Sequence, residues 1–252
     1  MNNPFSLEKK TILVTGASSG IGQQCAIDCS KMGAKVIFIG RNEERLTQTL
    51  SLMKGEGHIA YRYDFSDLDG IKDLVTRIVT ENGKFDGIIC SAGIERTAPT
   101  KLLKSSDYEE LFKVNTLSAF ELVKQITTIK NFNNGGAIVF ISSITSIIAR
   151  KGTAAYSASK GAIISGAKVF AAELANRNIR VNCISPGTIL TPLMQNYLAQ
   201  LSEEDYKKRV SGFPLGLGET TDISSACVFL LSEASRWITG QNLIIDGGFT
   251  MQ

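Results

Sequence analysis

The chain has 252 residues, of which 43% are hydrophobic and 20% are charged, with a formal net charge of +3. This composition is typical of a globular protein with a sizeable core, and the small, scattered positive charge gives no indication of a nucleic-acid partner. The opening residues lack the apolar stretch of a secretory signal, and no apolar run reaches the roughly 18 residues that span a membrane, so we expect a cytoplasmic protein without a membrane partner.

Short apolar, β-branched runs alternate with segments of helical periodicity. The predicted strands cover residues 11–16, 35–40, 58–64, 87–93, 137–143, 180–187 and 242–248. The clearest predicted helices cover residues 22–32, 67–81, 108–128 and 155–177. Strands that alternate with helices of this length form parallel βαβ units, and strands that are apolar throughout fit a sheet covered on both faces. We therefore predict an α/β fold with a single doubly wound domain over residues 1–252.

The first predicted strand runs directly into a glycine-rich turn, TGASSGIG at residues 15–22. Glycines at a strand-to-helix turn let the backbone approach a pyrophosphate, and the helix that follows offers free N–H groups. A P-loop would place Lys and then Ser or Thr after the last glycine, but Gln23 and Gln24 follow Gly22. The turn predicts a dinucleotide site, with a tight turn for helix packing as the structural alternative.

The end of the second predicted strand bears on which dinucleotide binds. An NAD site carries a carboxylate there for the ribose 2′-hydroxyl, whereas this strand ends in Gly40 and Arg41. A guanidinium pairs well with a 2′-phosphate, so we expect NADP(H). NAD(H) is the alternative, if Arg41 caps a solvated loop and Glu43 or Glu44 turns inward. Asp64, which ends the third predicted strand, is a candidate for the adenine amine or for a turn cap.

A phenol and an ammonium group stand four residues apart in the segment AAYSASKGA, residues 154–162. Tyr156 and Lys160 therefore share one face of a predicted helix. A cation within about 4–6 Å lowers the pKa of a phenol, which suits proton transfer to a carbonyl oxygen. An ordinary surface pair is the structural alternative for these two residues taken alone.

The longest stretch without a predicted strand covers residues 188–219. It follows the carboxyl end of a strand, where α/β proteins bind their ligands, so we expect a substrate lid. Its apolar side chains fit either a pocket lining or an amphipathic helix that covers the core. These side chains are Leu190, Leu193, Met194, Tyr197, Leu198 and Phe213.

Taken together, the motifs resemble the short-chain dehydrogenase/reductase family. They are TGASSGIG, VNT at residues 114–116, a serine 13 residues before the tyrosine of YSASK, RVNCISPG at residues 180–187, and DGG near the C-terminus. The resemblance covers nearly the whole chain. It implies a Rossmann-type sheet of seven parallel strands with helices on both faces, NAD(P) as the hydride carrier and, commonly, a homotetramer, with a homodimer as the alternative.

The family pattern implies roles for particular residues. The implied catalytic set is Asn115, Ser143, Tyr156 and Lys160. Tyr156 would act as general acid, Ser143 would hydrogen-bond the carbonyl oxygen, and Asn115 would help to position a water that feeds protons through Lys160. The implied coenzyme-binding residues are Gly16, Ser18, Ser19, Gly20, Ile21, Gly22, Arg41, Asp64, Phe65, Ala92, Gly93, Tyr156, Lys160, Pro186, Gly187, Ile189 and Thr191.

One motif departs from the family pattern. The fourth strand usually ends in Asn-Ala-Gly, but this chain has Ser91, Ala92 and Gly93. The asparagine normally braces the central sheet, and a serine side chain is shorter. We expect this change to affect local stability and not the chemistry.

The resemblance implies a carbonyl substrate whose class the residues leave open. The arginine after the second strand and the DGG terminus favour a 3-oxoacyl-[acyl-carrier-protein] reductase-like enzyme acting on an acyl thioester. An acidic carrier protein would need a basic rim, although charge runs on helices are usually solvated faces. Candidates for that rim are Arg177, Arg180, Lys207, Lys208 and Arg209. Residues 93–111 suit a sugar, steroid or small-ketone reductase equally well. The alternative function is an NAD-dependent alcohol, sugar or steroid dehydrogenase.

Other protein classes fit the sequence less well. A serine hydrolase needs a histidine, but the single His58 lies in a polar stretch and we expect it to be solvated. A coenzyme-binding sensor or scaffold usually lacks a catalytic residue, and here all four are present. The five cysteines include no CxxC pair, so we expect reduced, mostly buried thiols and no metal site.

The expected oligomer would use two apolar surfaces. In the family, the helix that carries the tyrosine and lysine packs with its neighbour against a twofold mate. The corresponding apolar residues are Phe112, Leu117, Phe120, Val123, Ile164, Val169 and Phe170. The C-terminal segment NLIIDGGFTMQ commonly forms a second interface.

Overall fold

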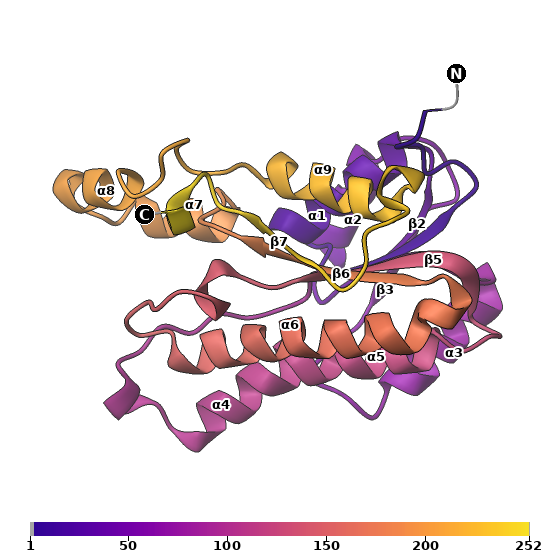
Figure 1. Ribbon diagram of the computed structural model, residues 1–252, viewed down its shortest axis with the longest axis horizontal. Helices are drawn as coiled ribbons and strands as arrows, with labels where there is room; N and C mark the ends of the chain where they lie inside the picture. Colours follow the sequence, from indigo (N-terminus) through magenta and orange to yellow (C-terminus); the bar gives the residue numbers. More distant parts are fainter. Residues whose placement is uncertain (1–2, 252) are drawn as a thin grey trace.

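The computed structural model describes residues 3–251 as a sheet with helices packed on both of its faces (Figure 1). The strands are β1 (Thr11–Thr15), β2 (Lys35–Gly40), β3 (Ile59–Arg62), β4 (Phe85–Cys90), β5 (Phe132–Ile141), β6 (Arg180–Pro186) and β7 (Asn242–Ile245). The helices are α1 (Gly20–Lys31), α2 (Glu43–Leu52), α3 (Ile71–Asn82), α4 (Ser105–Phe112), α5 (Ser118–Ile126), α6 (Ala154–Leu174), α7 (Pro192–Leu198), α8 (Glu203–Val210) and α9 (Thr220–Leu231). The strand order is β3-β2-β1-β4-β5-β6-β7 and each pairing is parallel, which confirms the predicted fold class.

Two apolar cores lie on opposite faces of this sheet. Successive side chains of a strand point to opposite faces, so Leu13 of β1 enters one core while Ile12 and Val14 enter the other. Helices α3, α5 and α6 cover the first core, and α1, α2 and α9 cover the second (Figure 1). Because both faces are covered at the centre of the sheet, β1, β2 and β4 are buried along most of their length, whereas the edge strands β3 and β7 are partly exposed.

Several element boundaries differ from the prediction. Strand β5 begins at Phe132, not at residue 137, and helices α2 and α9 were not among the predicted elements. The helix predicted over residues 108–128 consists of α4 and α5, joined by a π-helical segment at Lys113–Leu117. The predicted lid contains α7 and α8, and its two helices begin at the capping side chains of Thr191 and Ser202.

Only some of the apolar residues predicted for the twofold interface are exposed at the surface. Val123 is fully buried in the core, which corrects that prediction, because the helix turns this side chain towards the sheet. Phe120, Ile164 and Phe170 are partly buried against the same core. Leu117 and Val169 do remain exposed, although they lie on different helices. In the described part of the chain, no helix combines the length and the apolar character needed to cross a membrane.

The strand order places a binding edge at the centre of the sheet. The chain winds outward from β1 in one direction through β2 and β3, and from β4 in the other direction through β5, β6 and β7. The helices that follow β1 and β4 therefore leave on opposite faces, and the carboxyl ends of these strands diverge. This is the topological switch point at which open α/β sheets bind ligands.

Candidate active site

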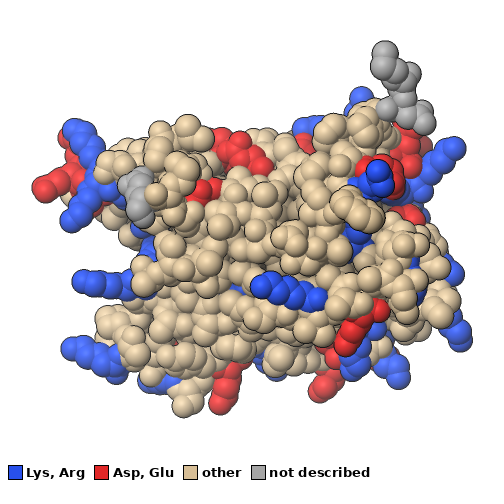
Figure 2. All heavy atoms as spheres, viewed as in Figure 1, with Lys and Arg blue, Asp and Glu red and all other residues tan. Residues whose placement is uncertain are grey.

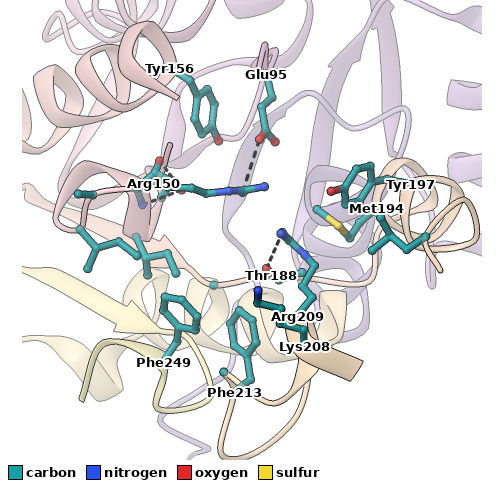
Figure 3. A pocket seen from close by; sticks show the side chains of 18 of the residues that line it. Glu95, Arg150, Tyr156, Thr188, Met194, Tyr197, Lys208, Arg209, Phe213 and Phe249 are labelled. Carbon is teal, nitrogen blue, oxygen red and sulfur yellow. Dashed lines mark hydrogen bonds and ion pairs between the residues drawn. The ribbon is translucent and has the colours of Figure 1, made fainter. Parts of the chain in front are cut away.

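Two adjoining cavities lie at the carboxyl ends of the strands. The first, of about 340 Å³, follows the glycine turn and is called the turn cavity here. The second, of about 570 Å³, is lined in part by α7 and α8 and is called the lid cavity (Figure 3). Ser143, Tyr156 and Glu95 line both cavities. The phenol and the serine hydroxyl therefore stand where the two spaces meet.

The glycine turn is shaped by close contacts between backbone segments. Gly16 has a φ of +70°, and a Cβ there would lie 2.8 Å from the Cα of Ala92. A Cβ on Gly22 would lie 2.4 Å from the carbonyl oxygen of Gly16. Helix α1 begins without a side-chain cap, since Ser19 makes no capping hydrogen bond. The first N–H groups of α1 are therefore left for another partner at the wall of the turn cavity.

Arg41 lies at the mouth of the turn cavity, directly after β2. Its side chain is exposed, and no carboxylate among residues 3–251 lies within 4 Å of it. The cap of α2 is Asn42, whose side chain accepts from the backbone N–H of Arg45 at 2.8 Å. Glu43 and Glu44 are exposed in the first turn of α2, outside the cavity lining. Asn42 and not Arg41 therefore caps α2, and neither Glu43 nor Glu44 turns into the cavity.

Asp64 also lines the turn cavity, and its side chain closes a turn. Its Oδ1 accepts from the backbone N–H of Ser66 at 2.9 Å. Hydrogen bonds from Ser66 lower the pKa of this carboxyl group, and the charge of Arg41 contributes in the same direction. The two interpretations of Asp64 are therefore compatible, because one carboxylate caps the turn and faces the cavity.

The turn cavity gathers all of the residues predicted for coenzyme binding. Three of the four predicted catalytic residues line it as well, and these are Ser143, Tyr156 and Lys160. Asn115 is fully buried behind the wall. The sequence motifs thus converge on one space although they come from segments more than 170 residues apart.

Lys160 is buried beside Tyr156 on α6. Its Nζ donates to the carbonyl oxygen of Ile141 at 2.9 Å and lies 5.9 Å from the centroid of the Tyr156 ring. Burial lowers the pKa of this amine to about 8. At pH 7 the group therefore still carries its charge, close to the point at which it can release a proton.

The pKa of Tyr156 is raised above its ordinary value. Burial is the largest cause, and the carboxylate of Glu95 acts in the same direction, while Ser143 and Arg150 oppose them. This differs from the expectation that Lys160 lowers the pKa of the phenol. The reason is geometric, since the Lys160 ammonium points at the Ile141 carbonyl.

Ser143 is oriented by its neighbour Thr145. Its Oγ accepts from the Thr145 backbone N–H at 3.2 Å and from the Thr145 hydroxyl at 3.0 Å. These two accepted hydrogen bonds leave the Ser143 O–H as a donor, and Ser143 hydrogen-bonds the Tyr156 hydroxyl at the boundary of the two cavities. A carbonyl oxygen at the boundary of the two cavities is a suitable acceptor for it.

Asn115 is held in the π-helical segment and uses its whole side-chain amide. Its Oδ1 accepts from the backbone N–H of Ile94 at 2.7 Å, and its Nδ2 donates to the Ile94 carbonyl and to Ser159 Oγ, each at 3.0 Å. A Cβ on Gly93 would lie 3.1 Å from Asn115 Oδ1 and 3.3 Å from Lys160 Nζ. The side chain thus ties the loop after β4 to α6.

Charged and aromatic side chains both line the lid cavity (Figure 3). Arg150 and Glu95 pair with an N–O distance of 3.9 Å. Across the cavity from them, Arg209 of α8 donates to Thr188 Oγ1 at 3.3 Å. The rings of Phe213 and Phe249 lie at a tilt to each other with centroids 4.5 Å apart.

The apolar residues predicted to line the lid divide into three groups. Met194, Tyr197 and Phe213 do line the lid cavity, as predicted. Leu193 lines the turn cavity and not the lid cavity. Leu198 is buried in the packing of the lid and, like Leu190, lines neither cavity.

Comparisons with known proteins agree with this geometry. Residues 16–250 match the family model described as enoyl-(acyl carrier protein) reductase. The glucose 1-dehydrogenase of Gluconobacter oxydans is 36% identical to this chain, and the match covers 96% of this chain and 92% of that protein. The 3-oxoacyl-[acyl-carrier-protein] reductase of Thermotoga maritima is 34% identical over 97% of this chain and 99% of its own. An Agrobacterium tumefaciens structure with bound NADP, 31% identical, superimposes with a TM-score of 0.88 over 100% of both chains.

The chain belongs to the short-chain dehydrogenase/reductase family. It is therefore an oxidoreductase that acts on the CH–OH or C=O group of its substrate.

Sequence reasoning missed two charged residues of this short-chain dehydrogenase/reductase. Glu95 and Arg150 face the lid cavity from loops before α4 and α6. Arg209, a candidate for the basic rim near the active site, lies inside the lid cavity itself. Loop positions have no periodicity to reveal them, and the direction of a side chain on α8 depends on how the lid folds back.

Two members of the predicted basic rim, Arg177 and Arg180, lie away from the cavities, whereas Lys208 lines the lid cavity. Arg180, at the amino end of β6, donates to the carbonyl oxygens of Leu230 and Ser232. Arg177 donates to the carbonyl oxygens of Thr127 and Phe132. Both arginines thus lie at the edge of the sheet opposite the cavities, where they satisfy carbonyl groups. The predicted rim is wrong for these two residues.

The single histidine is hydrogen-bonded within the fold, and the cysteines are buried in it. His58 Nδ1 accepts from the backbone N–H of Val36 at 3.1 Å, and its Nε2 lies 3.0 Å from the Lys54 carbonyl oxygen. This histidine is therefore bonded between two segments, not simply solvated as predicted. All five cysteines are free and buried, which confirms the prediction of reduced, buried thiols.

The bracing of the central sheet uses Thr15 in place of the usual asparagine. Thr15 Oγ1 accepts from the backbone N–H groups of Ser91 and Ala92, each at 3.1 Å. The Ser91 side chain makes no hydrogen bond that the described residues show. The Thr15 hydroxyl therefore extends the connection between β1 and β4 beyond the last paired residues, Thr15 and Cys90.

Replacing Thr15 by valine is expected to destabilise the protein by about 1–3 kcal/mol, because two N–H groups lose their acceptor at constant side-chain volume. Urea unfolding followed by circular dichroism measures the change. Thr76→Val is the matched control, since Thr76 is exposed on α3 and bonds only to the Lys72 carbonyl oxygen. Equal midpoints for the two variants would contradict the bracing role.

Proposed function

We propose that this chain is an NADP(H)-dependent oxidoreductase that reduces a small ketone to a secondary alcohol and catalyses the reverse oxidation. The observation that carries the proposal is the position of Tyr156 and Ser143 at the boundary of the turn cavity and the lid cavity. One space fits a dinucleotide and the other fits a substrate, and the proton-transferring groups lie between them.

The turn cavity supplies the features that a dinucleotide phosphate needs. Gly16 and Gly22 leave room where a Cβ would clash, and the uncapped start of α1 presents N–H groups. The exposed guanidinium of Arg41 supports selection of NADP(H) over NAD(H), because it matches the charge of a 2′-phosphate. NADP(H), when bound, supplies or accepts the hydride. The NADP-bound relative from Agrobacterium tumefaciens supports the same coenzyme.

Tyr156 is proposed as the general acid in reduction and the general base in oxidation. Ser143 would donate its O–H to the same carbonyl oxygen and stabilise the developing negative charge. Lys160, whose pKa burial lowers to about 8, would pass protons towards Tyr156 between turnovers. Asn115 is proposed as a positioning residue, because its hydrogen bonds fix Ile94 and Ser159 on either side of this group.

The lid cavity supports a small polar substrate in preference to a carrier-bound acyl chain. Glu95, Arg150 and Arg209 bring charged groups into the cavity, and two members of the expected basic rim are absent from its entrance. We propose residues 188–219 as the substrate lid of a single domain over residues 1–252. The reductase of acyl thioesters remains the second candidate, supported by the relative from Thermotoga maritima.

The exposed apolar side chains support assembly into a homodimer or homotetramer. Leu117 lies in the π-helical segment before α5 and Val169 lies on α6. Leu243 and Ile244 lie on the edge strand β7. Light scattering that gives a monomer at micromolar concentration would contradict this assembly. The free thiols support a reducing, cytoplasmic location, which fractionation of the source cells would test.

The first test is a side-by-side fluorescence titration of the protein with NADPH and NADH, followed by a panel of ketones and alcohols. We expect NADPH to bind at least about tenfold more tightly, a difference of about 1.4 kcal/mol. Tighter binding of NADH would overturn the coenzyme assignment. Binding of neither coenzyme would overturn the proposed function as a whole.

Glu95→Gln is expected to move the pH profile of alcohol oxidation to lower pH. Removal of the carboxylate charge favours the phenolate form of Tyr156, so its pKa falls and more of the base is present at a given pH. Below the midpoint the rate should rise by a factor on the order of 2–5. Steady-state oxidation rates between pH 7 and 10 measure the shift. Glu173→Gln, on the exposed face of α6, should leave the profile unchanged, and a shift to higher pH in Glu95→Gln would contradict the assignment.

A further inference from the structure

Arg209 is turned from α8 into the lid cavity, where it is only partly paired (Figure 3). One Nη donates to Thr188 Oγ1 at 3.3 Å, and the guanidinium carbon lies 5.5 Å from the centroid of the Tyr197 ring. Its Nε is buried and has no hydrogen-bond partner among the described residues. No carboxylate of residues 3–251 lies within 4 Å of this guanidinium.

A second guanidinium faces the same space from the opposite wall. Arg150 reaches into the lid cavity from the loop before α6, and its contact with Glu95 is long, at 3.9 Å. The other acidic group of the lining, Asp205, accepts from the Ser202 hydroxyl at 2.7 Å at the start of α8. The lining therefore contains three cations and two acids, and one of these acids is bonded to its own helix start.

This arrangement costs free energy unless an anion completes it. A buried N–H without an acceptor loses its hydration and gains nothing in return. Burial and the charge of Arg150 both lower the pKa of Arg209, which means that its surroundings disfavour the cation. The Arg209 guanidinium lies over the Tyr197 ring, and one of its Nη atoms donates to Thr188. Its Nε has no hydrogen-bond partner among the described residues. Two oxygens of a carboxylate or phosphate fit the planar fork of a guanidinium.

We propose that Arg209, assisted by Arg150, binds an anionic group of the substrate at the part of the lid cavity that lies apart from the turn cavity. The substrate is then a small keto acid or a phosphorylated ketone, in which the anion anchors one end while the carbonyl group meets Tyr156. The inference rests on the proposed function and specifies the substrate class of the same site.

The test compares pairs of ketones in which one member carries an anionic group and the other does not. The probes are 4-oxopentanoate with its methyl ester, and dihydroxyacetone phosphate with dihydroxyacetone, each reduced with NADPH. We expect kcat/KM to favour one anionic member over its neutral partner by about 30-fold, and the pair that shows this preference identifies a carboxylate or a phosphate. In Arg209→Met this preference should fall to about onefold through a rise in KM, and Arg209→Lys should restore part of it. Lys207→Met is the matched control, since Lys207 lies on the same helix and pairs with Glu203 outside the cavity.

The outcomes separate the two proposals. Turnover of the neutral probes without preference for an anion would overturn this inference and leave the proposed function intact. An anion preference that survives in Arg209→Met would overturn the role of Arg209. Tight NADPH binding with no turnover of any probe or of the ketone and alcohol panel would contradict the proposed function, and this inference with it.

Discussion

Tyr156→Phe is expected to reduce turnover by a factor of about 10²–10⁴ while NADPH binding changes by less than about threefold. The substitution removes one hydroxyl at the boundary of the two cavities and keeps the ring that packs there. No other phenol lines both cavities, so the proton would have to come from solvent. Single-turnover reduction rates and a coenzyme titration on the same preparation measure the two quantities separately.

Tyr206→Phe is the matched control for this substitution. Tyr206 lies on α8 with its side chain exposed, and it lines neither cavity. Its loss of a hydroxyl should leave turnover unchanged. If Tyr156→Phe retained a tenth or more of the wild-type rate, the phenol would not be the general acid. A sensor without turnover would bind coenzyme equally in wild type and variant and reduce no ketone in either form.

Arg41→Ala is expected to weaken NADPH binding by about 30–100-fold, which is roughly 2–2.7 kcal/mol. A charge-assisted pair between guanidinium and phosphate is lost, whereas NADH, which lacks the 2′-phosphate, loses little. Because the Arg41 side chain is exposed, its effect should shrink as salt screens the charge. Titrations with both coenzymes at low and high salt measure these differences.

Arg45→Ala provides the comparison for Arg41. Arg45 is four residues further along the chain, is exposed on α2 and lies outside the turn cavity. The Arg45→Ala variant tests whether any positive charge near the turn cavity attracts the coenzyme. Equal weakening of NADPH binding by both substitutions, or equal weakening of NADPH and NADH by Arg41→Ala, would contradict a specific contact with the 2′-phosphate.

The parts of this fold that sequence reasoning predicted are those in which local pattern and tertiary role coincide. Strand β2 is apolar throughout because both of its faces are covered, so its run of Val36 to Ile39 could be read directly. The glycine turn could also be predicted, because a Cβ at Gly16 or Gly22 would clash with neighbouring backbone atoms. Tyr156 and Lys160 were found through their spacing on one helix.

The parts that sequence reasoning missed depend on contacts between distant segments. The π-helical segment that holds Asn115 follows from its bonds to Ile94 and Ser159, which no helical periodicity encodes. The raised pKa of Tyr156 comes first from burial and then from the charge of Glu95, which approaches the phenol through the path of the loop after β4. Arg209 looked like part of a solvated charge run, and only the fold of the lid turns it inward.

Helix α8 stands at one end of the molecule and buries none of its eight residues (Figure 1). Its acids in the first turn and bases in the last match the helix dipole, and Figure 2 shows both signs of charge mixed at that end. Such a helix holds its shape through local interactions and contributes little to global stability. Its amide hydrogens should therefore exchange with solvent far sooner than those of the central strands, through local opening that leaves the sheet intact. The path into the lid cavity can thus open and close many times within the lifetime of the folded state.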